Sequence, residues 1–121
     1  MLRFSDLTLI AKCVSAKEAE TYLNQQKIDL IFLDIQMPKR TGIEFLRQLT
    51  DPPHIIFTTA FQEYALEGYE LSVLDYLLKP IGFERFTQAV KKAIAIFSAE
   101  QKVQAFDKLQ NFDSQFIVIK E

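Results

Sequence analysis

IDLIFLDIQMP, residues 28–38, is the stretch that decides the fold. A short apolar run bounded by turn signals is typical of a buried strand in a parallel sheet, and here the run ends at Asp34. Because open α/β sheets hold their ligands at the carboxyl ends of their strands, Asp34 is well placed for chemistry. An acid at a strand end can equally cap the next segment, and this run alone does not decide between the two.

Two further strand-like runs end in polar residues of complementary kinds. His54–Thr59 ends in a hydroxyl group, and residues 73–79 end in the ammonium group of a lysine. If these strands are parallel neighbours of the first, Asp34, Thr59 and Lys79 converge at one edge of the sheet. Such a set suits a phosphoryl site, in which the carboxylate is the nucleophile and the other two groups hold the oxygens of the phosphoryl group.

Composition restricts the class of protein. A chain of 121 residues, 49% of them hydrophobic and 25% charged, predicts one globular domain with a substantial core. The net charge of -2 argues against nucleic-acid binding by this segment. No apolar run has membrane-spanning length and no signal peptide is seen, so we expect a cytoplasmic protein without a membrane segment. The single cysteine, Cys13, fits a reducing compartment and is interpreted as a packed core thiol.

Strand and helix patterns alternate along the chain. The predicted strands cover residues 7–14, 28–34, 54–59 and 73–79. The predicted helices follow a capping box from Ser15 to Glu18, and then cover residues 43–49, 62–70 and 83–97. Alternation of this kind predicts a doubly wound parallel sheet of the α/β class, with helices on both faces.

Three ordered motifs carry a family resemblance. Residues 33–38 (LDIQMP) with Gly42, residues 56–60 (IFTTA) and residues 75–80 (DYLLKP) resemble the motifs of bacterial two-component response-regulator receiver domains. The residues of these motifs are most similar to those of the LytTR-linked (LytR/AlgR-type) regulators. The resemblance runs from about residue 7 to residue 97 and implies the flavodoxin-like receiver fold.

The resemblance also implies roles for single residues. Asp34 would be the phosphoacceptor, Thr59 the switch hydroxyl, Tyr76 the switch aromatic and Lys79 the phosphate-binding lysine, with a cis peptide bond between this lysine and the next proline. Asp34 and the backbone carbonyl of Gln36 would be ligands of Mg²⁺. Phosphorylation would draw in the Thr59 hydroxyl and let Tyr76 rotate inward, which couples a local charge to the surface of the domain.

Implied partners follow from the same family. A sensor histidine kinase would donate the phosphoryl group, and a homodimer would form through the last helix-strand-helix face. DNA would be bound only by an output domain that this chain lacks. The expected chemistry is that of a signalling domain and not of an enzyme with turnover, beyond phosphorylation and dephosphorylation of its own aspartate.

Both ends of the chain depart from the family pattern. Receiver domains begin with a strand that ends in the acidic pair that holds Mg²⁺, and here the first strand, its acids and nearly all of the first helix are missing. We therefore expect an incomplete receiver over residues 1–97, a helical linker over 98–115 and the start of a LytTR DNA-binding domain at 116–121. A sharper hypothesis is that residues 116–119 fold back into the vacant central slot of the sheet, with Glu121 near the position of the absent acids.

Two other functions remain open. Haloacid-dehalogenase-type phosphatases also use a strand-end aspartate, a threonine and a lysine, but they place a second aspartate where this chain has Gln36. The other function is that of a pseudo-receiver, which is never phosphorylated and acts by dimerisation. His54, the only histidine, is interpreted as a partly exposed turn residue and not as a ligand.

Overall fold

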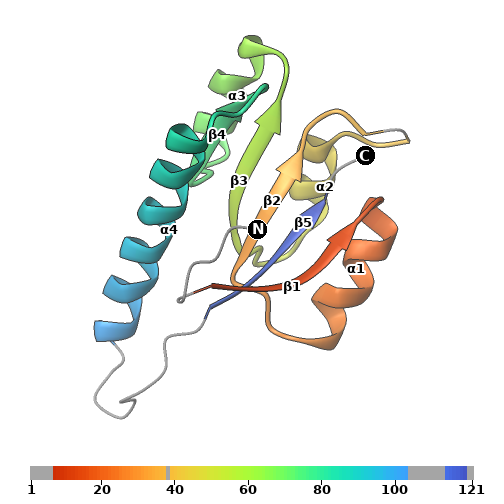
Figure 1. Cartoon of the computed structure of the whole chain (residues 1–121). Coiled ribbons are helices and arrows are strands. Elements are labelled where there is room, and N and C mark those ends of the chain that lie inside the picture. The colour runs from red at the N-terminus through yellow and green to blue at the C-terminus, as the bar shows by residue number, and fades with distance from the viewer. Residues whose placement is uncertain (1–6, 38, 104–113, 120–121) are drawn as a thin grey trace.

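The structure is a computed structural model, and it describes residues 7–37, 39–103 and 114–119 (Figure 1). Ten elements alternate along it in chain order, as follows: β1 (Leu7–Cys13), α1 (Ala16–Gln25), β2 (Leu30–Asp34), α2 (Gly42–Gln48), β3 (His54–Thr59), the 3₁₀ helix η1 (Gln62–Tyr64), α3 (Ala65–Glu70), β4 (Asp75–Leu78), α4 (Phe83–Val103) and β5 (Ser114–Ile119). The alternation predicted from the sequence is confirmed.

All five strands form one parallel sheet in the order β1-β5-β2-β3-β4. The last strand of the chain therefore lies between the first two (Figure 1). In the register, Ile119 of β5 lies opposite Cys13 of β1 and opposite Leu33 of β2. The hypothesis that residues 116–119 enter the slot beside the Asp34 strand is confirmed, whereas Glu121 lies outside the described residues. The domain limits at residues 97 and 115 stay predictions.

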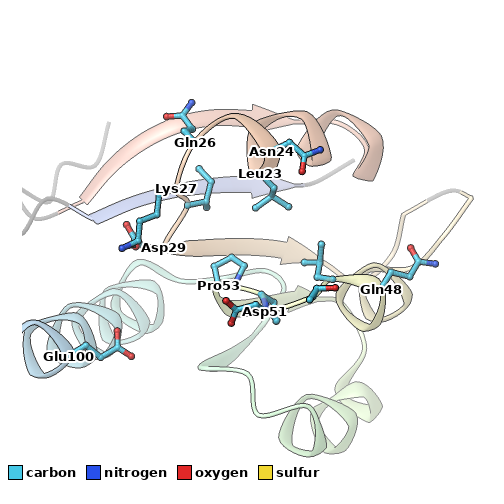
Figure 2. Close-up of a pocket in the computed structure, with 13 residues that line it drawn as sticks. Leu23, Asn24, Gln26, Lys27, Asp29, Gln48, Asp51, Pro53 and Glu100 are labelled. Atoms are coloured by element: carbon cyan, nitrogen blue, oxygen red, sulfur yellow. Dashed lines mark ion pairs between the residues drawn. The ribbon is translucent and has the colours of Figure 1, made fainter. Parts of the chain in front are cut away.

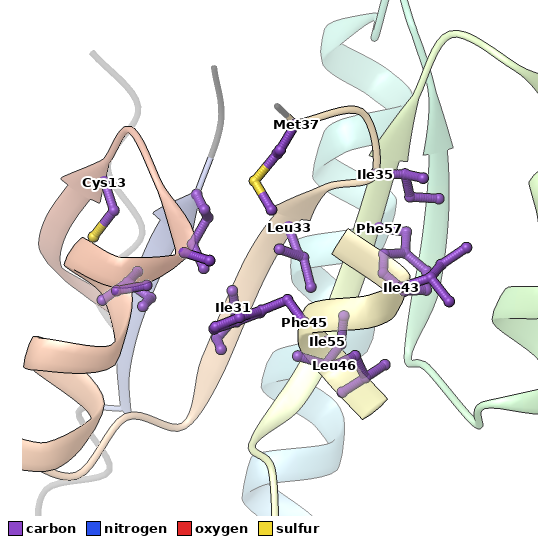
Figure 3. Close-up of a cluster of buried hydrophobic side chains, with 14 of the residues drawn as sticks. Cys13, Ile31, Leu33, Ile35, Met37, Ile43, Phe45, Leu46, Ile55 and Phe57 are labelled. Carbon is purple, nitrogen blue, oxygen red and sulfur yellow. The ribbon is translucent and has the colours of Figure 1, made fainter. Parts of the chain in front are cut away.

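Side chains on successive residues of β2 face opposite layers of the core. Ile31 and Leu33 belong to one cluster, which includes Phe45 and Leu46 of α2 and residues of α1 (Figure 3). Leu30 and Phe32 belong to a second cluster that packs against α4. A strand buried on both faces reads as a continuous apolar run, which explains the pattern of residues 30–33. The fold is thus a doubly wound α/β sheet, as the sequence predicts.

Cys13 lies within the first cluster and is 1% exposed. It is a free thiol, and its pKa is raised, chiefly by burial and also by the nearby Glu18 carboxylate. The interpretation as a packed core thiol is confirmed.

Several element boundaries differ from the predicted ones. Helix α4 continues six residues past Phe97 to Val103, because residues 98–103 contain neither glycine nor proline to end it. The segment predicted as one helix over residues 62–70 begins with the 3₁₀ turn η1. At the start of α1, Ser15 accepts the N–H of Glu18 as predicted, but the Glu18 carboxylate returns to the N–H of Val14. Among the residues that the structure describes, no helix is both long enough and apolar enough to cross a membrane.

Candidate functional site

The carboxyl ends of β2, β3 and β4 bring the predicted site residues to one edge of the sheet. Strand β3 pairs with β2 on one side and with β4 on the other, and Asp34 lies opposite Thr58. Lys79 follows β4 directly, and its N–H donates to the Thr59 carbonyl at 2.7 Å. Its Nζ lies 2.8 Å from Oδ2 of Asp34. The predicted convergence of carboxylate, hydroxyl and amine is therefore present.

The Asp34 carboxylate is buried yet paired on both oxygens. Asp34 is 2% exposed. Its Oδ2 accepts a hydrogen bond from Nζ of Lys79, and its Oδ1 accepts one from the N–H of Gln36 at 3.3 Å. A buried carboxylate without such partners would carry a large desolvation cost. The Lys79 side chain is 40% exposed, so this cation reaches the site from solvent and has room to move. The peptide bond between Lys79 and Pro80 is cis, as the family resemblance implies.

The loop after β2 passes very close to Asp34 at Gly42. The Gly42 N–H donates to the Ile35 carbonyl at 2.9 Å, and a Cβ at this position would overlap the carbonyl oxygen of Asp34. Helix α2 then begins with a full capping box, in which Thr41 and Glu44 satisfy each other's backbone N–H groups. This cap fixes where the loop ends and so where the backbone of Asp34 is held.

The Thr59 hydroxyl is fully buried and already has two partners. It donates to Oε1 of Gln36 at 2.9 Å and accepts the N–H of Phe61 at 3.1 Å. The Tyr76 hydroxyl donates to the carbonyl of the same Phe61. The two predicted switch residues are thus connected through the main chain of one residue, Phe61. The pKa of Tyr76 is raised, first by burial and second by the negative charge of Glu63.

Sequence reasoning missed the Gln36 side chain and Phe61 as parts of this network. It assigned Gln36 only a backbone role, and Phe61 contributes through its main chain, which leaves no mark on the sequence. It also missed the ion pairs at Asp75, whose side chain is 9% exposed and accepts two hydrogen bonds from Arg85 at 2.7 and 3.1 Å. An acid at the start of an apolar strand was the only available signal for that pair.

The described residues do not complete a magnesium site. Mg²⁺ prefers six oxygen ligands in octahedral geometry, several of them often water. Within the described ranges, Asp34 is the one carboxylate at the carboxyl end of a strand, and no group of three or more His, Cys, Asp and Glu residues could hold a metal ion. One oxygen of Asp34 is also taken by Lys79. The assignment of Asp34 and the Gln36 carbonyl as metal ligands stays a prediction.

A cavity of about 620 Å³ lies at the opposite edge of the sheet, away from these residues (Figure 2). It is lined by the loops before β2 and β3, including Lys27, Asp29 and Asp51, and by Glu100 of α4. The nearby His54 is half-buried at the first position of β3 and pairs with Glu100 at 3.0 Å. The expectation of a partly exposed histidine is confirmed. None of the predicted site residues lines this cavity, so the candidate site is at the carboxyl ends of the strands.

The fold and this arrangement define an open, doubly wound α/β domain with a paired carboxylate at the carboxyl end of a strand. A family model described as "Response regulator receiver domain" matches residues 1–91. The chain belongs to this family, and it is a receiver domain of the two-component response-regulator type.

Two curated relatives illustrate the match. The chain is 38% identical over 93 residues to "Sensory transduction protein LytT" of Bacillus cereus, a match that covers 74% of this chain and 38% of LytT. It is 40% identical over 90 residues to "Transcriptional regulatory protein BtsR" of Salmonella typhi, which covers 72% of this chain and 37% of BtsR. The chain thus spans a little over a third of the length of these relatives.

Solved receiver structures share the fold. The response regulatory domain of protein mrkE from Klebsiella pneumoniae superposes with a TM-score of 0.62 at 32% identity, over 69% of this chain and 71% of that one. The response regulator protein TrrA from Thermotoga maritima, solved in complex with Mg²⁺ and BeF, has a TM-score of 0.55 at 28% identity, over 65% of this chain and 71% of that one. The magnesium ion of that complex belongs to TrrA.

Proposed function

We propose that Asp34 accepts a phosphoryl group from a sensor histidine kinase, and that this receiver controls transcription as part of a longer cytoplasmic regulator. The observation that carries the proposal is the buried Asp34 carboxylate held 2.8 Å from the Lys79 ammonium. Among the relatives, the name of BtsR states transcriptional regulation. Membership of the response-regulator family implies that the phosphoryl donor is a phosphohistidine of the kinase.

The transfer step uses Asp34 as the nucleophile. One carboxylate oxygen forms the new P–O bond while the P–N bond of the phosphohistidine breaks, and the imidazole nitrogen keeps the electron pair and takes up a proton from water. Lys79 leaves the carboxylate and pairs with the phosphoryl oxygens, which neutralises part of the charge that repels two anions. Because the Lys79 side chain is 40% exposed, its move from the carboxylate to the phosphoryl oxygens needs no repacking of the core.

The signal would leave the site through Thr59. A phosphoryl group on Asp34 offers stronger acceptors than the Gln36 amide, so the Thr59 hydroxyl exchanges one for the other. This pulls on the N–H of Phe61, the residue whose carbonyl accepts the Tyr76 hydroxyl, and lets the tyrosine ring move. Helix α3 carries Leu66 and Tyr69, which are 67% and 82% exposed. They favour the α3-β4-α4 face as the homodimer surface.

The test is phosphate uptake by the full chain from a radiolabelled acyl phosphate in a buffer that contains Mg²⁺. We expect one acid-stable, base-labile phosphoryl group per chain, absent in Asp34→Asn. Asp51→Asn is the matched control, because Asp51 is exposed, lines the cavity at the opposite edge of the sheet and has a positive φ of 54° that asparagine tolerates.

Other outcomes would favour the two alternatives. A folded chain that takes up no label, even when it is joined to a first strand with the acidic pair, would support the unphosphorylated pseudo-receiver. Continuous release of inorganic phosphate over many turnovers, lost in Asp34→Asn, would support a phosphatase.

A further inference from the structure

The slot between β1 and β2 is a strand-binding site. Its two walls are the main chains of these strands. Strand β5 pairs in parallel with β1 over residues 114–119 and with β2 over residues 116–119. Without β5, both walls would expose unpaired N–H and C=O groups in the middle of the sheet, which is a template for another strand.

The slot holds its strand through apolar side chains and main-chain hydrogen bonds. Ile117 and Ile119 fill the cluster shared with α1 and α2, and both are 0% exposed. Phe116 and Val118 pack on the α4 side. At the entrance, Asp29 accepts the N–H of Gln115 at 2.8 Å and donates its own N–H to the Gln115 carbonyl at 2.7 Å. These last contacts are with main-chain atoms, so any strand with this alternation of side chains fits.

Every copy of the chain carries such a strand, β5, after α4. Ten residues, 104–113, separate α4 from β5. When extended, a stretch of this length spans up to about 33–36 Å, which is enough to reach a neighbouring copy. Exchange between two copies would fill both slots with native contacts and close a twofold dimer without leaving a free central edge.

We propose that the β1–β2 slot accepts β5 of a second copy, so that two chains form a dimer by reciprocal exchange of their last strand. The contacts within each sheet are the same in monomer and dimer. The ratio of dimer to monomer is therefore determined by the protein concentration relative to the effective concentration of the chain's own β5 at the slot. The inference is independent of phosphorylation at Asp34.

Cys13 supplies a native probe of which chain provides β5. It lies opposite Ile119 across the β1–β5 pair and is the only cysteine of the chain. In Ile119→Cys, oxidised glutathione can convert the two facing thiols to a disulfide while it is itself reduced to two thiols. The bond is intrachain in a monomer and interchain in an exchanged dimer, and non-reducing electrophoresis separates the two.

The experiment refolds the full-length variant over a series of concentrations, oxidises it and measures mass by light scattering. We expect interchain disulfide dimers whose ratio to monomer rises about tenfold for each tenfold rise in free monomer, as mass action requires. Ile119→Ser, which lacks the second thiol, should give none. Only intrachain bonds at all concentrations would overturn the proposal, and so would a dimer whose disulfides are all intrachain, since it would form through another face.

A second variant covers the case in which Ile119→Cys does not fold. Lys12 and Val118 are also partners in the β1–β5 register, and neither side chain is fully buried. The variant Lys12→Cys/Val118→Cys, with Cys13→Ala, therefore repeats the test outside the core.

Discussion

Gly42 sets how closely the chain after β2 can pass Asp34. At the residue scale this contact matters as much as the charged pair, because the backbone of Asp34 must be held still for its carboxylate to face Lys79. A methyl group on Gly42 would overlap the Asp34 carbonyl oxygen, and backbone atoms cannot yield as a flexible side chain can. The glycine is therefore required by space and not by its dihedral angles, since no glycine in the described ranges has a positive φ.

Gly42→Ala is expected to lower the free energy of unfolding by about 1–3 kcal/mol, the usual cost of overpacking. It should also slow phosphate uptake at Asp34. Urea denaturation and the labelling assay measure the two effects. Gly82→Ala is the matched control, because a Cβ there meets no atom within 4 Å. Equal stability of the two variants would show that the loop after β2 relaxes freely.

At the scale of elements, the ion pairs of Asp75 fasten β4 to α4. Arg85 donates two hydrogen bonds to Asp75 and a third to the Tyr76 carbonyl at 3.1 Å, and Lys92 lies 3.7 Å from Asp75. Burial alone would raise the pKa of Asp75, but the hydrogen bonds from Arg85 and the Tyr76 N–H, with the charges of Arg85 and Lys92, lower it overall. The same pairing raises the pKa of Arg85, against the effect of burial. This junction positions β4, the strand that Lys79 follows.

The lowered pKa of Asp75 predicts a pH dependence of stability. Its contribution is complete above the unfolded-state value of about 3.9 and is lost as the pH falls through the lower folded-state value. Asp75→Asn should therefore reduce the unfolding free energy at neutral pH, by about 1 kcal/mol for a partly exposed pair. The difference from the unmodified chain should shrink below the unfolded-state value. Urea titrations at several pH values check this, with exposed Glu70→Gln as control. A difference that does not change with pH would contradict the assignment.

For the whole molecule, β5 joins two parts of the sheet. Within the described residues, β1 pairs only with β5, and β2 pairs with β5 and β3. The β1–α1 unit is thus attached to the rest of the sheet through a strand that comes last in the sequence. Contacts so distant in sequence form late and carry a high closure cost in folding.

Ile117→Ala should lower the unfolding free energy by about 2–5 kcal/mol, as for other large-to-small changes at fully buried sites. It should also increase amide hydrogen exchange across β1 and α1 more than across β3 and β4. Leu9→Ala is the control, since Leu9 is 44% exposed and a change there should cost little. Uniform exchange across the sheet in Ile117→Ala would show that β1 does not depend on β5 for its attachment.

Much of this structure was determined by local sequence. The alternation of apolar runs with amphipathic segments determined the doubly wound sheet, because burial on two faces and on one face leave different periodicities. The parallel order of three strands then made it predictable that Asp34, Thr59 and Lys79 meet at one edge. Even the entry of residues 116–119 into the sheet could be framed as a hypothesis, from the vacant central slot that the family resemblance implied.

Only the tertiary structure decided which atoms pair at that edge. The bonds from Thr59 to the Gln36 side chain, from Tyr76 to the Phe61 carbonyl and from Arg85 to Asp75 join residues of different segments. Their partners depend on distances between elements and on main-chain atoms, which carry no residue-specific signal. The position of β5 beside β2 was likewise decided by packing, because the slot, and not any local preference, determines which strand fills it.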